Sequence, residues 1–256
     1  MIRFIVLLAA AWSSAVAAAP FAYITNQASH DVSVIDVGTA RVVATIPVGK
    51  SPAGVVVSEA AGKAFVSNPD SKSISVIDLA TRRVIDTLDG GSGPVGIDAA
   101  PDGSRLYVAD WYRNALLVID AATHRRIAEV PVGKAPAGVA VAPDSRTIYV
   151  ANRDDDAVGI IDATSLRQVA TLKAGSHPFA VGLVPDGSRL FALNVWSHDV
   201  TVIDARTRET LATIPVGNSP YGVAFSADGS RAWVTNQHAE TVSVIDTAAL
   251  RVVDTV

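Results

Sequence analysis

The chain has 256 residues, of which 49% are hydrophobic and 18% are charged, and its formal net charge is −4 at pH 7. This mild acidity argues against a protein built chiefly to hold phosphate backbones. There is no cysteine in the sequence, which excludes disulfides, thiolate metal sites and a lipid-anchoring cysteine.

The first segment has the layout of a secretory signal peptide. Arg3 and the amino terminus give a positive start, Phe4 to Trp12 form a short apolar run, and small residues follow from Ser13 to Ala19. The apolar run is short for a bilayer-spanning helix. The alternative is an uncleaved amino-terminal anchor.

We therefore expect residues 1–17 to form a signal peptide, with cleavage as late as residue 19. Residues 18–256 contain no linker and are expected to form one domain without a membrane span. The expected location is the periplasm, or outside the cell as a secreted or surface protein.

One triplet recurs at a fixed interval through the rest of the chain. Val-Ile-Asp, once Ile-Ile-Asp, ends at Asp36, Asp78, Asp120, Asp162, Asp204 and Asp246, always 42 residues apart. A strict period of this length is the signature of a repeat architecture. Each repeat contains four short runs rich in β-branched residues, separated by turn residues. Four strands in about 42 residues predict a β-propeller blade.

Two recurring residue types support this interpretation. Glycine returns inside an apolar strand at Gly54, Gly96, Gly138 and Gly222. It predicts close approach of neighbouring backbones where inner strands crowd an axis. The aspartate of each triplet is expected to cap a turn, as Asp36 does with Thr39, and not to act in catalysis.

The repeats resemble those of a known family. The matching segments are YITN at Tyr23–Asn26, YVAN at Tyr149–Asn152 and WVTN at Trp233–Asn236, together with SVID, ATIPVG and PDGSR. They resemble the YVTN-type β-propeller repeats of surface-layer and YncE-like proteins, and the resemblance covers Phe21 to Val256. It implies an all-β ring of four-stranded blades. It implies no single function, because relatives include surface-layer proteins, periplasmic proteins reported to bind DNA and companions of quinone-cofactor oxidation pathways. Similar repeats also build the haem-binding propellers of some nitrite reductases.

The number of blades follows from the inner-strand prolines. These are Pro52, Pro94, Pro136, Pro178 and Pro220, which is one fewer than the triplets. We therefore predict a ring of six blades whose seam blade, Phe21 to Val48, has three strands, and closure of the ring at this seam is left open. The alternative is a truncated member of a seven-bladed propeller.

Binding residues are expected on one face of the propeller. The loop after each YVTN-like strand and the loop before each Pro-x-Gly strand share that face, and they differ between repeats. The candidates for binding a ligand or partner are Trp111, Tyr112, Arg113, Trp196, Phe179, Tyr221, Lys50 and Lys134. Exposed aromatic rings can stack on sugars, bases or a partner's side chains. Alternatively, they pack over neighbouring blades.

Four histidines are expected on the same face. They are His30, His177, His198 and His238, which come from three consecutive blades if the ring closes. Such a cluster can hold a transition metal or an axial haem position. The spacing is that of the repeat and not of a metal motif, so no cofactor is predicted and the metal or haem site remains an alternative. Asp154, Asp155 and Asp156 lack the spacing of a calcium loop and are expected to be solvated.

The sequence contains none of the common catalytic motifs, so no catalytic residue and no enzyme is predicted. We expect an exported, non-catalytic propeller that binds a protein partner or a small ligand on its variable face. One alternative is an accessory or metal- or haem-binding protein of periplasmic redox metabolism linked to quinone cofactors. The other is single-stranded DNA binding through Trp111, Arg113 and Trp196, which the net acidity disfavours. The oligomeric state is left open.

Overall fold

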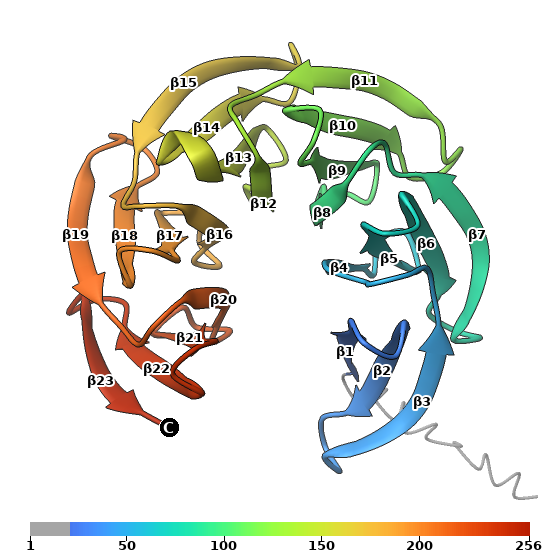
Figure 1. Cartoon of the computed structure of the whole chain (residues 1–256), viewed down its shortest axis with the longest axis horizontal. Helices are drawn as coiled ribbons and strands as arrows, with labels where there is room; N and C mark the ends of the chain where they lie inside the picture. The colour runs from blue at the N-terminus through green and yellow to red at the C-terminus, as the bar shows by residue number, and fades with distance from the viewer. Residues whose placement is uncertain (1–20) are drawn as a thin grey trace, which may run out of the picture.

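The computed structural model describes residues 21–256, and the expected signal peptide at residues 1–17 lies outside the described residues. Six antiparallel sheets follow one another along the described chain (Figure 1). In each sheet the strands run from the axis outward in chain order. Within residues 21–256 the structure contains no helix with the length and apolar character needed to cross a membrane.

The first blade has three strands, β1 (Phe21–Asn26), β2 (Asp31–Asp36) and β3 (Arg41–Pro47). The second contains β4 (Val55–Ser58), β5 (Lys63–Asn68), β6 (Ser73–Asp78) and β7 (Arg83–Asp89). The third contains β8 (Pro94–Ala99), β9 (Arg105–Asp110), β10 (Ala115–Asp120) and β11 (Arg126–Pro131). The fourth contains β12 (Pro136–Val141), β13 (Thr147–Asn152), the 3-10 turn η1 (Arg153–Asp155), β14 (Ala157–Asp162) and β15 (Arg167–Lys173).

The fifth blade contains β16 (Pro178–Leu183), β17 (Arg189–Asn194), β18 (Asp199–Asp204) and β19 (Thr210–Pro215). The sixth contains β20 (Pro220–Phe225), β21 (Arg231–Asn236), β22 (Thr241–Asp246) and β23 (Arg251–Thr255). The predicted blade count and the three-stranded first blade are therefore confirmed.

The middle strands are buried on both faces, as their composition predicts. In β18 every residue from Val200 to Ile203 is buried, although successive side chains point to opposite sides of the sheet. This is possible because each sheet is covered by a blade on either side.

One aromatic residue per blade forms the centre of each interface with the next blade. In blades 1 to 5 this residue is at most 9% exposed. Burying a side chain of this size stabilises the fold by roughly 1.5–3 kcal/mol. The five pairs are Tyr23 with Val66, Phe65 with Val108, Tyr107 with Val150, Tyr149 with Ala192, and Phe191 with Val234.

Within residues 21–256 the sixth interface is not formed, so the six blades form an open arc and the closure left open above is not made. Trp233 occupies the aromatic position of the last blade and is 39% exposed. Ile24 occupies the facing position of the first blade and is 47% exposed. Figure 1 shows the first and last blades on opposite sides of the opening. Each interface turns one blade relative to the next, and the five interfaces of the described chain do not complete a circle.

The recurring glycines set how closely the inner strands approach. A Cβ atom on Gly96 would lie 2.0 Å from the carbonyl oxygen of Ala137 in the next blade, and one on Gly138 would lie 2.7 Å from that of Phe179. The predicted close approach is therefore confirmed. A Cβ atom on Gly222 would meet only Thr235 of its own blade, because no further blade packs on β20.

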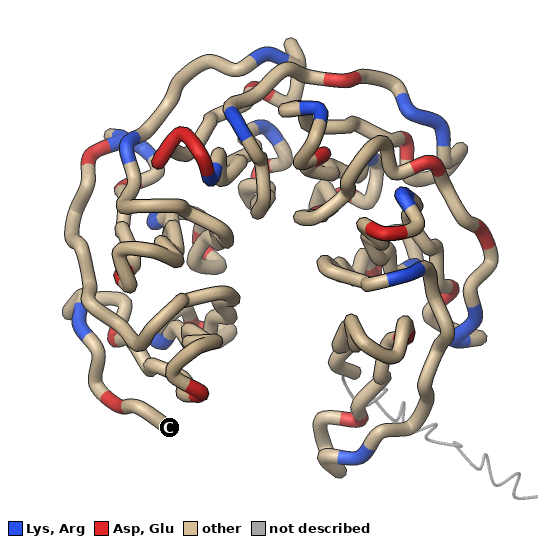
Figure 2. Tube along the Cα trace, viewed as in Figure 1, with Lys and Arg blue, Asp and Glu red and all other residues tan. Residues whose placement is uncertain are grey.

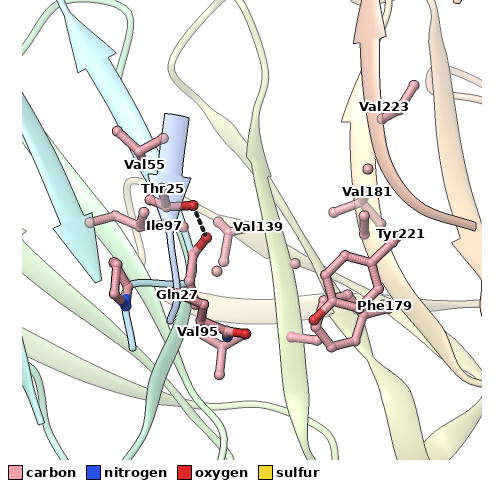
Figure 3. Close-up of a pocket in the computed structure, with 18 of the residues that line it drawn as sticks. Thr25, Gln27, Val55, Val95, Ile97, Val139, Phe179, Val181, Tyr221 and Val223 are labelled. Atoms are coloured by element: carbon pink, nitrogen blue, oxygen red, sulfur yellow. Dashed lines mark hydrogen bonds between the residues drawn. The ribbon is translucent and has the colours of Figure 1, made fainter. Parts of the chain in front are cut away.

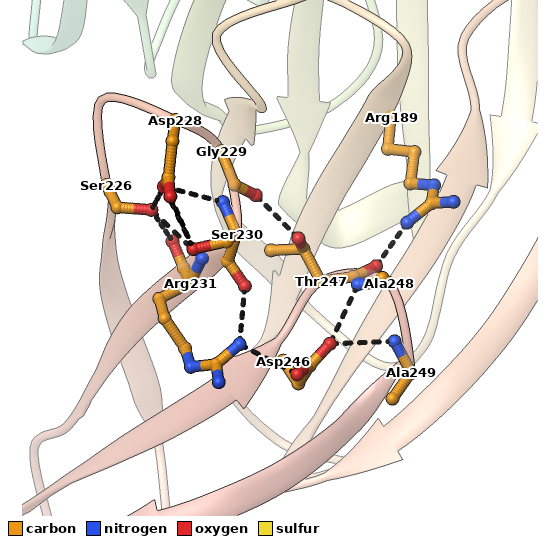
Figure 4. A network of polar contacts seen from close by, with 10 residues as sticks. All are labelled: Arg189, Ser226, Asp228, Gly229, Ser230, Arg231, Asp246, Thr247, Ala248 and Ala249. Carbon is orange, nitrogen blue, oxygen red and sulfur yellow. Dashed lines mark hydrogen bonds and ion pairs between the residues drawn. The ribbon is translucent and has the colours of Figure 1, made fainter.

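The aspartate of each triplet caps the turn that leads to the outermost strand of its blade. Asp36 Oδ1 accepts a hydrogen bond from the Thr39 amide at 2.9 Å, as predicted. In the last blade, Asp246 Oδ1 accepts the Ala249 amide at 2.8 Å, while Asp246 Oδ2 pairs with Arg231 at 2.7 Å (Figure 4). These residues serve the scaffold.

Candidate functional site

A central pocket of about 500 Å³ lies where the inner strands converge (Figure 3). All six blades contribute to its lining, mostly through backbone and small apolar side chains of the Pro-x-Gly strands. Its polar side chains are Thr25, Gln27, Gln237 and the hydroxyl-bearing Tyr221, and no charged side chain lines it. Figure 2 shows that lysine, arginine and acidic residues lie mainly outside the strands around the axis. The pocket therefore suits an uncharged group.

One wall of the pocket is aromatic. The rings of Phe179 and Tyr221, which belong to neighbouring blades, stack with centroids 4.2 Å apart at 23°. Trp111 lies 6.3 Å from Phe179 at a tilt of 52° and continues the wall toward the rim. Tyr221 is 40% exposed, and its partial burial raises the pKa of its hydroxyl above the ordinary value. A hydroxyl with a raised pKa stays protonated and able to donate at physiological pH.

Beyond the wall, the rim carries a second aromatic group. The Arg153 guanidinium lies 5.4 Å from the Trp111 ring and 5.5 Å from the Trp196 ring, which are cation–π distances. His177 stacks on Trp196 with centroids 3.6 Å apart. Arg153 also donates to Asp154 Oδ1 at 2.6 Å, which neutralises its charge locally. Trp196 is 61% exposed and stands on the rim, outside the pocket lining.

The structure thus brings together part of the predicted set. Phe179 and Tyr221 line the pocket, Trp111 extends its wall, and Trp196 stands at the rim. Tyr112 does not line the pocket; it lies over Gly93 and is 75% exposed.

The three basic candidates are not brought to the pocket. Arg113 Nε lies 3.1 Å from Glu129 Oε1 on the outer strand β11, so its charge is directed away from the axis. Lys134 is exposed, with Nζ 4.0 Å from Asp155 Oδ1. Lys50 is exposed, and its backbone amide donates to Ser71 Oγ at 2.9 Å.

The histidines His30 and His198 have a structural role that the sequence analysis did not find. Nδ1 of each accepts the backbone amide of the serine before the next inner-strand proline, Ser51 and Ser219, both at 3.1 Å. These bonds join the loop of one blade to the loop of the next.

Other residue types perform the same task in the third and fourth blades. Asn114 Oδ1 accepts the Ala135 amide at 3.0 Å, and Asp156 Oδ1 accepts the His177 amide at 2.8 Å. Asp155 Oδ2 also accepts the Lys134 amide at 2.7 Å. The acidic loop is therefore partly engaged in inter-blade bonding, in addition to being solvated.

No group of three or more histidine, aspartate or glutamate side chains in residues 21–256 is arranged to hold a metal ion. The candidate cluster is separated because the arc is open. His30 belongs to the first blade, on the far side of the opening from His198 and His238 (Figure 1). His198 and His238 both contact Ser219, through its amide and its hydroxyl.

One repeat position explains the pocket residues that the sequence analysis did not single out. Gln27, Arg153 and Gln237 directly follow the last residue of the YVTN-like strand, the position that Trp111 holds in the third blade. Gln27 and Gln237 line the pocket, whereas Arg153 lies beside Trp111 at the rim. The variability of this position within an otherwise regular repeat was the available signal.

Comparison with known proteins agrees with this architecture. A family model of the YNCE-like β-propeller matches residues 59–143 and 140–230. No match was found among curated proteins.

Two solved structures share the fold at low sequence identity. Hydrazine synthase of Kuenenia stuttgartiensis superposes with a TM-score of 0.66 at 21% identity, covering 88% of this chain and 92% of that chain. A functionally unknown protein from Desulfotomaculum acetoxidans DSM 771 superposes with a TM-score of 0.81 at 16% identity, covering 91% of this chain and 81% of that chain. Identities this low support the fold alone. With most of its length matched by the family model, the chain belongs to the YNCE-like β-propeller family.

Proposed function

We propose that this chain is a non-catalytic binding propeller that takes a neutral small organic molecule with a planar apolar face in its central pocket. The observation that carries the proposal is an aromatic wall, Phe179 on Tyr221, in a concave pocket without charged side chains. A pocket of about 500 Å³ is in the size range of small-molecule sites. The concave shape favours a small ligand over a flat protein surface.

The lining of the pocket assigns how the ligand binds. Its apolar face lies against Tyr221 and Phe179, where stacking is favourable. Its polar edge faces Gln27, Gln237 and the inner-strand carbonyl groups, which offer both donors and acceptors. A fused ring that buries about 150 Å² of apolar surface gains roughly 4 kcal/mol before the cost of association. Ring stacking alone therefore gives weak binding, and the polar edge supplies the specificity.

The geometry gives less support to the other two functions. The histidines of the candidate metal or haem site accept backbone amides or contact hydroxyls, and no set of three is assembled in the described chain. A strand of DNA along Trp111 and Trp196 would pass Asp154, and Arg113 is paired with Glu129. Neither arrangement favours phosphate or metal over a neutral ligand.

The proposal includes export from the cytoplasm. It is supported by the signal-like layout of residues 1–17. Amino-terminal sequencing of the protein recovered from a cell-envelope or culture fraction tests it. Cleavage after residue 17, or as late as residue 19, is expected, and an intact amino terminus on cytoplasmic protein would contradict export.

Binding is tested with coumarin as the neutral bicyclic probe, titrated into the purified chain by isothermal calorimetry and saturation-transfer NMR. Tyr221→Ala is expected to weaken binding about tenfold, because it removes one stacked ring. Trp233→Ala is the matched control, since Trp233 is 39% exposed, against 40% for Tyr221, but does not line the pocket. Equal affinity in both variants, or no binding of coumarin at millimolar concentration, would overturn the proposal.

A further inference from the structure

A second cavity lies at the opposite end of the blades from the central pocket. It has a volume of about 310 Å³ and lies between the fourth blade and the turn that follows β18 in the fifth blade. Thr147, which lines it, is the first residue of β13, whereas Asn152 ends that strand beside the rim. The two cavities share no lining residue, so a ligand of one does not occupy the other.

The cavity forms where the repeat loses a long basic side chain. In the second blade this position holds Lys63, whose Nζ donates to the Ala121 carbonyl of the next blade at 3.1 Å. In the third blade it holds Arg105, which donates to the Ala163 carbonyl at 2.8 Å. The fourth blade has Thr147, whose side chain is too short to reach across the interface. The space that a basic side chain fills in the other blades is therefore open to a ligand.

The turn of the fifth blade supplies a different basic group at this place. Arg208 lines the cavity from that turn. Its equivalent in the second blade is Arg82, whose guanidinium lies 4.3 Å from the centroid of the Phe21 ring, a cation–π distance. Because the fourth blade has Thr147 at the position of Phe21, Arg208 has no aromatic ring from that position.

Arg208 also has no acidic partner. Within residues 21–256 the arginines that form ion pairs are Arg113, Arg126, Arg153 and Arg231. Of the described residues that line the cavity, only Asp162 is acidic, and its Oδ1 already accepts the amide and the hydroxyl of Ser165 at 2.6 and 2.7 Å. An unpaired guanidinium can bind a carboxylate through two parallel hydrogen bonds. The cavity therefore favours an anionic group at Arg208.

The remaining lining suits an apolar ring with a polar edge. The side chains of Tyr149 and Ile160 pack in the same apolar cluster, and Val169 of the outermost strand also borders the cavity. Burial raises the pKa of the Tyr149 hydroxyl, although the charge of Arg208 opposes the rise. This hydroxyl is therefore protonated at neutral pH and able to donate a hydrogen bond. The cavity combines an apolar wall with a cation and a hydroxyl donor.

We propose that this cavity binds a small aromatic monocarboxylate. Its ring takes the place that Phe21 has in the first blade and packs on Tyr149, where an aromatic pair is favourable. Its carboxylate pairs with Arg208 and accepts a hydrogen bond from the Tyr149 hydroxyl. Asp162 disfavours a second negative charge, because hydrogen bonds within its turn lower its pKa and keep it ionised. This ligand differs in charge and in site from the neutral one proposed for the central pocket.

Sodium benzoate serves as the probe and is titrated into the purified chain by saturation-transfer NMR, with benzyl alcohol as the neutral analogue. Saturable binding of benzoate is expected, with benzyl alcohol bound about tenfold more weakly because charge-assisted hydrogen bonds are lost. Arg208→Gln is expected to weaken benzoate binding by about the same factor, and it changes an exposed side chain, so folding is not at risk. Arg206→Gln is the matched control and retains binding, since Arg206 is an exposed arginine of the same turn that does not line the cavity.

A second variant fills the cavity from the fourth blade. Thr147→Arg restores the basic residue of the third blade and is expected to abolish benzoate binding, whereas Thr147→Ser retains it. Coumarin is expected not to displace benzoate, because the two cavities are separate. Equal affinity for benzyl alcohol and benzoate, unchanged affinity in Arg208→Gln or in folded Thr147→Arg, or no benzoate binding at about 10 mM would contradict the proposed site. Displacement by coumarin would assign benzoate to the central pocket and contradict it as well.

Discussion

The side-chain amide of Asn152 faces Gly159, where a Cβ atom would lie 3.1 Å from Asn152 Nδ2. Both polar side-chain atoms of Asn152 are buried without a hydrogen-bond partner in the described structure. In other blades this amide has a hydroxyl partner seven residues on. Asn194 Nδ2 donates to Thr201 Oγ1, and Asn236 Nδ2 donates to Ser243 Oγ, both at 2.9 Å.

The third blade has a different buried polar residue at the position of Asn152. Asp110 replaces asparagine there and accepts the amides of Ser92 at 2.7 Å and Gly93 at 2.9 Å. A carboxylate has no proton to give, and the residue seven positions on is accordingly Leu117. In the fourth blade, Asn152 is therefore present as an amide donor, but Gly159 provides no hydroxyl to accept from it.

Gly159→Ser is expected to stabilise the protein by about 1 kcal/mol, because the new hydroxyl accepts from a buried amide that is otherwise unpaired. The Cβ also comes within 3.1 Å of Gln168 Oε1, but Gln168 lies on an outer strand and its side chain can move. Urea denaturation measures the change. Gly159→Ala controls for backbone effects, and a serine variant no more stable than the alanine variant would contradict the expected bond.

Asp98 is expected to make stability depend on pH. It replaces the apolar or small residue of the other inner strands, and burial raises its pKa to about 6 despite hydrogen bonds from the Val141 and Ala99 amides. Since this exceeds the ordinary value of 3.8, the folded state binds the proton more tightly than the unfolded state. This contribution to stability is fully present below about pH 4 and lost as pH rises through about 6.

Asp98→Asn is therefore expected to raise the free energy of unfolding at pH 8, by at most about 3 kcal/mol, and to change it little at pH 4. Urea denaturation at both pH values measures this difference. Asp228→Asn serves as a contrast, because hydrogen bonds from Ser226 and Ser230 lower the pKa of Asp228 to about 2. Asp228 therefore stabilises the fold above pH 4, and its replacement is expected to lower stability at pH 8. A flat difference for Asp98→Asn between pH 4 and 8 would rule out its titration in this range.

His198→Ala is expected to destabilise the protein by about 1 kcal/mol, because the Ser219 amide loses its acceptor at 3.1 Å. His198→Asn restores most of this loss, since Asn114 performs the same task for Ala135. Thermal unfolding of the two variants measures the comparison. If zinc raised the melting temperature of the wild type and not of either variant, His198 would have a metal-binding role instead.

The open arc predicts unequal effects of two equivalent aromatic residues. Tyr149→Ala is expected to cost about 3–5 kcal/mol, because Tyr149 is 3% exposed and packs against Ala192. Trp233→Ala is expected to cost less than about 1.5 kcal/mol, because Trp233 is 39% exposed and has no facing blade in the described structure. Equal losses in chemical denaturation would show that the two ends pack together in solution.

The local architecture of this protein can be predicted from its repeated sequence. The 42-residue period predicted the strands, the blade count and the three-stranded first blade, and the Asp36 turn cap followed from residue type alone. These features depend on contacts within one repeat or between consecutive repeats, so each copy of the repeat encodes them again. Phe179 and Tyr221 were also found in this way, because they break the pattern at positions close to the axis.

The relation between the first and last blades, and the contacts of each divergent side chain, are visible only in the folded structure. Whether Trp233 contacts Ile24 depends on the rotations between neighbouring blades, which add up over five interfaces. The sequence of one repeat does not specify this total rotation. His30 and His198 resembled ligands in the sequence but accept backbone amides, because their loops lie beside the next blade. The pocket is lined mainly by backbone and small residues, which become a site only when six blades bring them to one axis.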